Sequence, residues 1–280
     1  MKYLVLGSEG LIGKALCAHL EAYGDTILRC DIKNNSFDED LRYEFNSYID
    51  ELFNEADFVF FLAFDIGGSK YIKKYERTYP YMDNNMRIMA NSFAYLHAHK
   101  KPFVFASSQM AEMPWSNYGM LKRTGENITR SLGGRYVRFW NVFGDEGNED
   151  PEKYHVVTDF LLNAFEGEIE MRTLGNERRQ FLHADDAAEA LHAVALNYPN
   201  IPMDMSLDIT SFHWISIYDL ARVIAEPHDA KVIRGTDQDQ VQQGTIVEPN
   251  KAILEFWQPK LSLGVGLQRV SDALGVTVGR

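Results

Sequence analysis

The chain has few cysteines and no long apolar run. Its 280 residues include two cysteines, Cys17 and Cys30, which lie inside apolar segments and form no CxxC pair. Buried or free thiols are therefore expected rather than a disulfide, and a metal site has little support. No apolar run approaches the roughly 18 residues that a membrane span requires. We expect neither a bound metal nor a membrane segment.

A surplus of positive charge is also missing, because 28 basic residues face 40 acidic ones and the formal net charge is −12. Such a surface repels nucleic acid and anionic lipid. An anionic ligand must therefore be met locally, by main-chain amides or by a few placed arginines. The apolar stretch at residues 1–7 is too short for a secretory signal, so a cytoplasmic location is expected.

What the first half does contain is an alternation of short β-rich runs and helical patterns. Apolar residues make up 45% of the sequence and charged residues 24%, which is typical of a globular protein. The alternation predicts an α/β fold with a Rossmann-type, doubly wound parallel sheet. The expected strands cover 2–6, 26–31, 58–63, 103–107 and 135–139, and the expected helices cover 11–23, 47–56, 81–99 and 117–132.

The pattern changes after Gly144, where a polar, acidic stretch begins and helices then mix with irregular segments. We expect a dinucleotide-binding domain over residues 1–144. A smaller, mostly C-terminal substrate-binding domain is expected over 145–280. Segments within 178–213 are expected to return to the first domain, namely a helix at 186–197 and a strand at 205–209.

A glycine-rich turn joins the first expected strand to the first expected helix. Gly7, Gly10 and Gly13 have the spacing G-x-x-G-x-x-G. A tight turn needs residues without Cβ, and the main chain must come close to a pyrophosphate that the helix N-terminus can bind. A tight turn alone could explain the glycines, but their place between strand and helix favours a dinucleotide site. Leu11 and Ile12 belong to the expected contacts.

Asp31 supports the same interpretation, because it ends the second expected strand 18 residues after Gly13. A carboxylate there can accept hydrogen bonds from both ribose hydroxyls of the adenosine. Its charge would repel a 2′-phosphate, so NAD is favoured over NADP, although Lys33 nearby softens that preference. A solvated strand end is the alternative for Asp31.

Tyr118 and Lys122 lie four residues apart on one face of an expected helix. Tyrosine is a poor base at neutral pH, but a neighbouring ammonium and the positive nicotinamide ring of NAD⁺ favour the phenolate. Tyr118 can then take the proton of a sugar hydroxyl while hydride leaves the carbon. Ser108 ends the fourth expected strand and can hydrogen-bond the reacting oxygen. An exposed tyrosine–lysine pair on an ordinary helix face is the alternative.

These features occur in the order and spacing of a known family. Over almost its whole length, the sequence resembles an extended short-chain dehydrogenase/reductase of the nucleotide-sugar epimerase/dehydratase group. The blocks that carry the resemblance are GSEGLIG (7–13), Asp31, Asp40-Leu41, Phe61-Leu62-Ala63, Asn85, Ser107-Ser108, YGMLKRTGE (118–126), RFWNVFG (138–144) and RRQFLHADDAAEAL (178–191).

The resemblance implies an NAD-dependent enzyme that acts on a nucleotide-diphosphate sugar. It implies that Asn141 and Arg179 bind the substrate, the Arg179 guanidinium gripping the diphosphate. We expect Gln109, next to Ser108, to contact the substrate too. A homodimer would form through the helices near 81–99 and 117–132. Further residues would bind NAD, with Asp40 and Leu41 by the adenine and Phe61, Ala63, Asn85 and Lys122 along the channel.

Two departures from the family narrow the expected chemistry. The family's 4,6-dehydratases carry an Asp–Glu pair after the catalytic Ser or Thr, where this chain has Gln109 and Met110. These side chains can neither protonate a leaving group nor abstract a proton. Members that epimerise C3 and C5 use a cysteine in this region, and no cysteine follows Cys30. Hydride transfer at one carbon remains, most simply at C4, either as 4-epimerisation or as net oxidation or reduction.

Several alternatives stay open. Residues 65–71 form a glycine hinge followed by basic and aromatic residues, which is typical either of a lid over the sugar or nicotinamide or of a surface loop. For His183, Asp185 and Asp186 we prefer a helix start capped by Asp185 or Asp186 over a metal site. A short-chain reductase of small ketones and a non-catalytic NAD-binding sensor or scaffold compete with the nucleotide-sugar enzyme.

Overall fold

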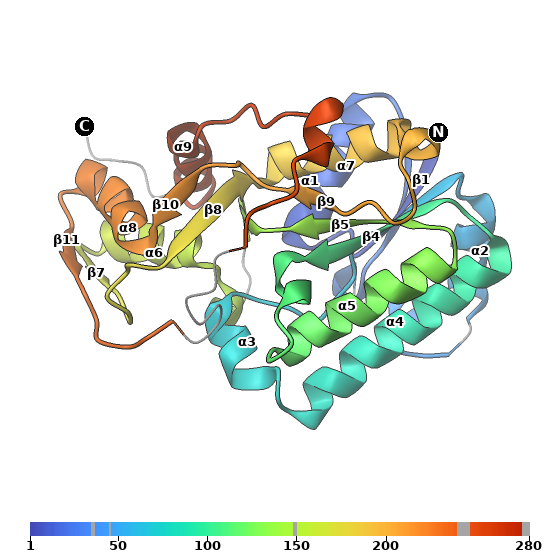
Figure 1. Cartoon of the computed structure of the whole chain (residues 1–280), viewed down its shortest axis with the longest axis horizontal. Helices are drawn as coiled ribbons and strands as arrows, with labels where there is room; N and C mark the ends of the chain where they lie inside the picture. Colours follow the sequence, from blue (N-terminus) through green and yellow to red (C-terminus); the bar gives the residue numbers. More distant parts are fainter. Residues whose placement is uncertain (35–36, 45, 148–149, 240–246, 276–280) are drawn as a thin grey trace.

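The computed structural model describes residues 1–34, 37–44, 46–147, 150–239 and 247–275. Its centre is a parallel sheet of six strands in the order β2-β1-β3-β4-β5-β9 (Figure 1). β3 and β4 consist of residues that are buried along the whole strand, as expected of strands covered on both faces. The strands are β1 (Lys2–Leu6), β2 (Thr26–Cys30), β3 (Phe58–Phe61), β4 (Phe103–Ser108), β5 (Arg135–Phe139) and β9 (Leu207–Ile209).

The strand order creates a crevice at the carboxyl edge of the sheet. The chain places β2 on one side of β1 and then crosses over to place β3 on the other side. The connections on the two sides of such a switch point diverge, so a ligand can bind between the loops that follow β1 and β3. Gly7 and Ala63 lie in these two loops.

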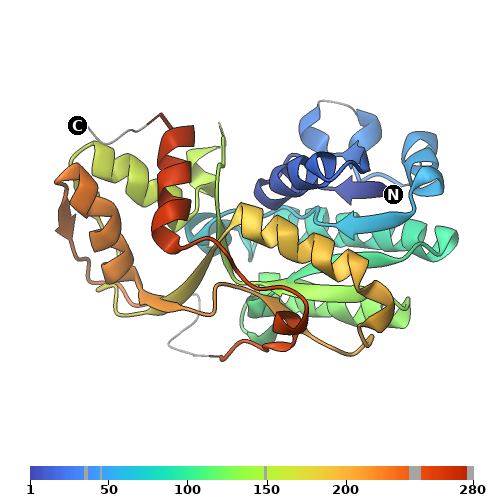
Figure 2. The same ribbon diagram turned by 90° about the horizontal axis from the view of Figure 1, so that it is seen from above.

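Helices cover both faces of the sheet. On one face, α1 (Leu11–Ala22) packs beside α7 (Ala184–Leu196), as Figure 2 shows. The opposite face is covered by α2 (Ser47–Glu55), α4 (Tyr79–His99) and α5 (Asn117–Ser131). The alternation of side chains along β1 supplies both cores, since Tyr3 and Val5 face the first set of helices while Leu4 and Leu6 face the second.

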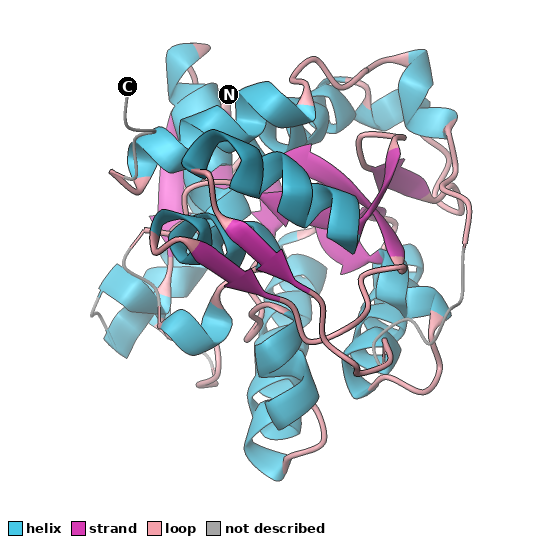
Figure 3. Cartoon of the chain, turned by 90° about the vertical axis from the view of Figure 1, so that its left-hand side faces the viewer, coloured by secondary structure: helices cyan, strands magenta, loops and turns pink. Residues whose placement is uncertain are grey.

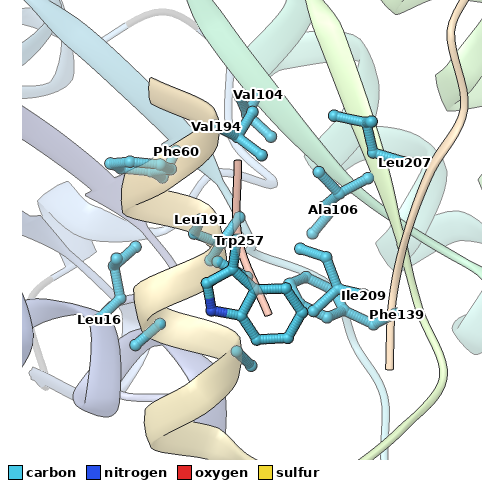
Figure 4. Close-up of a cluster of buried hydrophobic side chains, with 14 of the residues drawn as sticks. Leu16, Phe60, Val104, Ala106, Phe139, Leu191, Val194, Leu207, Ile209 and Trp257 are labelled. Carbon is cyan, nitrogen blue, oxygen red and sulfur yellow. The ribbon is translucent and has the colours of Figure 1, made fainter. Parts of the chain in front are cut away.

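A residue near the C-terminus completes the first of these cores. The Trp257 side chain lies between α7 and the sheet, in contact with Leu191, Ile209 and other apolar side chains (Figure 4). Trp257 is 5% exposed, so it buries most of its large apolar surface there. The chain therefore returns to the sheet after building most of the C-terminal lobe.

Among its described residues, the C-terminal lobe contains two small sheets and three α-helices around a core of its own, seen on the left of Figure 1 and facing the viewer in Figure 3. One sheet has the order β10-β8-β6, and the other pairs β11 with β7. The elements are β6 (Asn141–Phe143), β7 (Glu168–Glu170), β8 (Arg178–His183), β10 (Trp214–Ser216), β11 (Lys231–Ile233), α6 (Val156–Phe165), α8 (Ile217–Ala225) and α9 (Leu263–Ala273).

The predicted α/β class with a doubly wound parallel sheet is confirmed. Within 178–213, α7 and β9 lie with the first half of the chain, whereas β8 belongs to the three-stranded sheet of the C-terminal lobe. Among the described residues, the model contains no helix of the length and hydrophobicity that crossing a bilayer requires.

The predicted cap of α7 is wrong. The helix begins at Ala184, and the Nδ1 atom of His183 accepts the hydrogen bond of the Asp185 N–H at 3.2 Å. Asp186 instead accepts the main-chain N–H groups of Lys260 and Leu261, while Asp185 pairs with an arginine of α9. Both carboxylates therefore fasten the C-terminal segment to α7. In the part of the chain that the model describes, no three His, Cys, Asp or Glu side chains converge as a metal site would require.

Candidate active site

A cleft of about 770 Å³ runs from the carboxyl edge of the six-stranded sheet to the C-terminal lobe. It brings together most of the residues that the sequence analysis selected. The lining includes Gly7, Gly10, Leu11, Ile12, Gly13, Asp31, Asp40, Leu41, Ala63, Ser108, Gln109, Tyr118, Lys122, Asn141 and Arg179.

The glycine-rich turn forms one wall, and its three glycines meet different demands. Gly7 has a φ of +88°, and a Cβ there would lie 2.7 Å from the main-chain N of Ala63. A Cβ on Gly13 would lie 2.0 Å from the carbonyl O of Gly7. The fold itself therefore requires these two glycines. A Cβ on Gly10 would be 3.4 Å from the nearest protein atom, so its lack of a side chain leaves space on the cleft side.

Gly10 is also the N-cap of α1 and provides no side-chain acceptor for the first N–H groups of the helix. These groups and the helix dipole form a site for a phosphate. An open Gly10 beside uncapped N–H groups fits the pyrophosphate of a dinucleotide.

Asp31 stands at the end of β2 and is tied to the turn. Its Oδ2 accepts the N–H of Glu9 at 2.9 Å, and its Oδ1 accepts the N–H of Lys33 at 2.9 Å. The carboxylate thus fixes the glycine-rich turn as well as lining the cleft. Glu39, which the sequence analysis missed, also lines the cleft and accepts the N–H of Asp31 at 2.9 Å. Glu39 directly precedes Asp40 in the sequence, and this proximity to an expected cofactor-binding residue could have indicated that it lines the cleft.

Asp40 and Leu41 line the same end of the cleft. The Arg42 guanidinium holds Asp40 through two parallel hydrogen bonds, of 2.9 Å from Nε and 2.6 Å from Nη2. Burial alone would raise the pKa of the Asp40 carboxyl, but the hydrogen bonds from Arg42 bring it below its ordinary value.

Phe61 and Asn85 do not line the cleft, contrary to expectation. Phe61 is fully buried and its ring packs against Phe93 and Phe105, both at 5.2 Å between centroids. Side chains alternate along β3, so Phe61 points into the core beneath α2, α4 and α5, while Ala63 lies beyond the strand end and lines the cleft. Asn85 is buried too, and its amide fixes the main chain of Asp65, accepting from N at 2.8 Å and donating to O at 3.1 Å.

The side chains of Ser108 and Tyr118 lie near each other in the cleft, at the carboxyl end of β4. Ser108 is the last residue of β4, and Tyr118 lies in the first turn of α5. The two elements can come this close because Gly119 has no side chain. A Cβ there would lie 2.2 Å from the carbonyl O of Met110, just after the strand. The tyrosine ring is 6% exposed and meets the edge of Phe64 at 5.7 Å.

The electrostatics of Tyr118 and Lys122 differ from the expectation. Burial raises the pKa of the Tyr118 phenol, and the nearby Ser108 hydroxyl opposes this only in part. The Lys122 ammonium donates to the carbonyl O of Ala106 at 2.7 Å and lies 5.8 Å from the centroid of the Tyr118 ring. Burial lowers the pKa of Lys122 to about 7, although the Glu126 carboxylate opposes the shift. The protein alone therefore does not acidify Tyr118.

A buried ion pair between Glu126 and Arg138 joins α5, the helix that carries Tyr118 and Lys122, to the sheet. Glu126, on α5, is fully buried and accepts two hydrogen bonds from Arg138, at 2.7 and 2.8 Å. Glu126 also accepts the hydroxyl of Ser107 at 2.6 Å. This network joins α5 to β4 and β5, the elements next to Ser108 and Tyr118. The sequence analysis assigned no role to Glu126 or Arg138.

Gln109, Asn141 and Arg179, the residues expected to bind the substrate, also line the cleft. The Asn141 amide donates to the carbonyl O of Gln180 at 3.1 Å. The Arg179 guanidinium is paired with Asp239, with 2.7 Å between Nη2 and Oδ2, and both side chains are largely buried. An anion that binds Arg179 must therefore share it with Asp239 or displace it.

Residues 65–71 line the cleft rather than lying free on the surface. The segment leads into α3 (Ser69–Tyr75), and the Gly68 N–H donates to the carbonyl O of Lys153 at 2.8 Å. A Cβ on Gly68 would lie 2.1 Å from the carbonyl O of Tyr154, so the two segments are in close contact. The segment thus bridges the sheet edge and the C-terminal lobe, and a covering role remains a prediction.

A family model described as "NAD dependent epimerase/dehydratase family" matches residues 3–206. The chain belongs to this family of enzymes, whose cofactor is NAD and whose relatives include nucleotide-sugar epimerases and reductases.

Individual relatives are distant. GDP-L-fucose synthase 1 of Arabidopsis thaliana is 24% identical, with 97% of this chain and 92% of that protein covered. A GDP-6-OMe-4-keto-L-xylo-heptose reductase from C. jejuni has a similar structure, with a TM-score of 0.84, 16% identity and coverage of 98% and 97% of the two chains. UDP-glucose 4-epimerase from Thermotoga maritima has a TM-score of 0.79, 19% identity and coverage of 98% and 99%.

Proposed function

We propose that the chain catalyses hydride transfer between NAD and one carbinol carbon, C4, of a sugar linked to a nucleotide diphosphate. The observation that carries this proposal is that Ser108, Tyr118 and Lys122 line the cleft together at the carboxyl end of β4, with Lys122 one helical turn from Tyr118. The glycine-rich turn also lines this cleft. Proton transfer and cofactor binding are thus combined in one site.

The fit of a dinucleotide rests on the first wall of the cleft. Gly10 leaves space beside the N-terminus of α1, Asp31 stands at the end of β2, and Ala63 lies across from the turn. These residues would hold the pyrophosphate and the adenosine ribose. A bound NAD would supply the hydride acceptor or donor, and its oxidised form would add positive charge to the site.

The chain's own residues would carry the proton. Ser108 donates a hydrogen bond to the sugar oxygen, and Tyr118 removes its proton on oxidation or returns one on reduction. Burial raises the pKa of Tyr118, so proton removal at neutral pH depends on positive charge added nearby. Lys122 has a pKa of about 7 and can supply part of that charge once a phenolate forms.

The residues beside Ser108 restrict the reaction. Gln109 and Met110 are buried at the start of the turn after β4, and neither side chain exchanges protons at neutral pH. Loss of water from the sugar and epimerisation next to a keto group both need a further acid or base. Hydride transfer with a single proton transfer requires only Tyr118 and Ser108.

The substrate class follows from the polar groups at the other end of the cleft. The Arg179 guanidinium can form parallel hydrogen bonds with two phosphate oxygens, and Asn141 offers a second polar contact. Among the relatives, the names GDP-L-fucose synthase and UDP-glucose 4-epimerase both include a nucleoside-diphosphate sugar. We therefore propose such a sugar as substrate. The identity of its nucleotide base is to be determined by titration.

Calorimetric titration with UDP, GDP and dTDP tests the substrate class. We expect one of them to bind with a dissociation constant in the micromolar range and Arg179→Met to weaken that binding about a hundredfold. The absence of binding by all three would instead favour a reductase of small ketones. Incubation with the matching nucleotide sugars then separates the two outcomes at C4. A lasting change in NADH absorbance indicates net oxidation or reduction, and sugar conversion without one indicates epimerisation.

We also propose a homodimer through α4 and α5. Met86 on α4 is 46% exposed and Met120 on α5 is 45% exposed, and the two helices pack side by side. Apolar side chains on adjacent helices suit a contact with a second copy. Light scattering after gel filtration should give twice the 32.1 kDa mass of the chain, and the single-chain mass would contradict the proposal.

A further inference from the structure

The ammonium of Lys122 lies against the face of an aromatic ring. Its Nζ atom is 3.7 Å from the centroid of the Phe64 ring, which lines the cleft, and 5.1 Å from that of Phe105. The Phe64 ring also packs on the Tyr118 ring in a T-shaped contact, with 5.7 Å between the centroids. One aromatic side chain therefore contacts both Tyr118 and Lys122.

The main chain on both sides of Phe64 is anchored. The preceding residue, Ala63, packs against the glycine-rich turn, where a Cβ on Gly7 would lie 2.7 Å from the Ala63 N atom. The following residue, Asp65, is held by the Asn85 amide, which accepts from its N atom at 2.8 Å and donates to its carbonyl O at 3.1 Å. These contacts fix the point at which the Phe64 side chain leaves the main chain.

The charge on Lys122 is held with little water around it, since the residue is 4% exposed. One of the three N–H groups of the ammonium donates to the carbonyl O of Ala106 at 2.7 Å. The Glu126 carboxylate, one turn further along α5, raises the pKa of Lys122, but it also accepts two hydrogen bonds from Arg138. The negative face of an aromatic ring attracts a cation most strongly where water is excluded. The Phe64 ring therefore stabilises the charged form of Lys122.

The balance between the two forms of Lys122 is close. Burial lowers its pKa to about 7, so the ammonium and the neutral amine are nearly equal in free energy at neutral pH. The neighbours named above from β4 and from residue 64 are a carbonyl and two rings, which do not titrate. On α5, the titratable neighbours are the Tyr118 phenol and the Glu126 carboxylate. A change in one neutral contact can therefore decide which form is present.

We infer that Phe64 is a positioning residue, whose ring face keeps the Lys122 side chain in its charged form one helical turn from Tyr118. The effect on the charge of Lys122 belongs to the chain alone, whereas the effect on turnover rests on the proposed function.

The test follows the titration of Lys122 by NMR of isotope-labelled lysine side chains, so it requires neither cofactor nor substrate. The Lys122 signal is identified by its absence from Lys122→Met. We expect Phe64→Leu to lower the titration midpoint by about one pH unit, because an aliphatic side chain has no negative face. Phe64→Tyr keeps the ring and should change the midpoint by less than about 0.3 pH unit. Phe160→Leu removes another ring that lines the cleft and should leave the midpoint unchanged.

An unchanged midpoint in Phe64→Leu would overturn the inference. Equal changes in Phe64→Leu and Phe64→Tyr would overturn it as well, because the ring would then not be the cause. If Phe64→Leu folds poorly, Phe64→Met provides the same comparison with a second side chain that has no ring.

The unmodified chain offers an independent measurement. A ring shields the protons that lie over its face, so the Cε protons of Lys122 should resonate upfield of those of exposed lysines. Phe64→Tyr should preserve this upfield position, and Phe64→Leu should remove most of it. A Lys122 signal at the position of the exposed lysines would contradict the contact with the ring.

Turnover separates the inference from the proposed function. With the substrate found by titration, turnover at pH 7 should fall about fivefold in Phe64→Leu, in line with the smaller charged fraction of Lys122, and less than about twofold in Phe64→Tyr. A lowered midpoint with unchanged turnover would overturn the role of Phe64 in the reaction. Absence of turnover in the unmodified chain would instead contradict the proposed function, since the titration of Lys122 does not depend on it.

Discussion

The two ends of the cleft are held in place by different kinds of contact. At the cofactor end, Gly7, Gly13 and Asp31 are fixed by close main-chain approaches and main-chain hydrogen bonds. At the end proposed to bind the substrate, called the substrate end below, Arg179 is held by a carboxylate, Asp239, 60 residues away in the chain. The cofactor end is thus shaped by the fold, whereas the substrate end holds an ion pair that an anionic ligand must rearrange.

The largest expected effect on affinity concerns the cofactor end of the cleft, where the main chain is closely packed. Gly13→Ala places a Cβ 2.0 Å from the Gly7 carbonyl, so the turn and α1 must separate. We expect NADH affinity to fall by about a hundredfold or more and the melting temperature to drop by at least about 4 °C. Gly10→Ala is the matched control, because its Cβ meets no protein atom closer than 3.4 Å.

The control should separate binding from folding. Gly10→Ala is expected to keep the melting temperature within about 2 °C and still weaken NADH about tenfold, by crowding the phosphate. Scanning calorimetry measures the melting temperature, and titration with NADH measures the affinity. If Gly10→Ala weakened folding as much as Gly13→Ala, the distinction between the glycines would be wrong.

The second-largest expected effect concerns the other end of the cleft, where Arg179 is paired with Asp239. Arg179→Met should weaken binding of the nucleoside diphosphate about a hundredfold, since a charged, bidentate contact is lost. Asp239→Asn should have the opposite effect and tighten it about threefold to tenfold, because the internal competitor for Arg179 loses its charge. Calorimetric titration measures both. Weaker binding in Asp239→Asn would mean that Asp239 positions Arg179 rather than competing for it.

Lys122 lies between the two ends, and its burial has a cost in stability. The folded chain holds the pKa of Lys122 near 7, below the ordinary value of 10.5, so the unfolded chain binds more protons between these pH values. The free energy of unfolding therefore gains from this group as pH rises through that window. Lys122→Met should raise the melting temperature at pH 7 by about 2–4 °C, and the gain should shrink toward pH 10. A lower melting temperature at pH 7 would contradict the assignment.

The smallest effect lies on α7, outside the set of residues that line the cleft. His192 is buried beside His19, 3.0 Å away, and 3.8 Å from Asp25. Burial, followed by the His19 and N-terminal charges, lowers the pKa of His192, while Asp25 opposes the shift. Its contribution to stability is therefore complete above about pH 6.5 and is lost as pH falls through the lower, folded pKa.

His192→Gln should flatten the loss of stability below pH 6.5 by less than about 1 kcal/mol. Urea unfolding at pH 5 and pH 8 measures the effect, and NADH affinity at pH 8 should stay unchanged. If the pH dependence of the unfolding free energy is unaltered in the variant, protonation of His192 does not cause this loss of stability.

The comparison of the two ends also explains how much the sequence predicted. Strands and helices came within a few residues of the observed ones because their apolar periodicity is local. Gly7, Gly13 and Asp31 were placed correctly because a turn and a strand end are local features too. The Arg179–Asp239 pair and the Glu126–Arg138 pair join residues that only the fold brings together, and spacing along the chain carries no signal for them.

The errors have the same origin. Phe61 was assigned to the cleft from its motif, but the alternation of side chains along β3 turns it into the core. The cap of α7 was assigned to an aspartate, whereas both aspartates make contacts with the C-terminal segment that is distant in sequence. Lys122 and the nicotinamide ring together were expected to favour the Tyr118 phenolate; in the chain alone, burial is the largest influence on the pKa of both Tyr118 and Lys122.

The central claim is that the Tyr118 hydroxyl transfers the proton, and one measurement tests it most directly. Turnover of the substrate found by titration is compared between the unmodified chain and Tyr118→Phe, with NADH affinity measured on both. We expect turnover to fall by about 10²–10⁴, the usual contribution of a positioned acid or base, with NADH affinity changed by less than about threefold. Turnover within about twofold of the unmodified chain, at equal NADH affinity, would contradict the account.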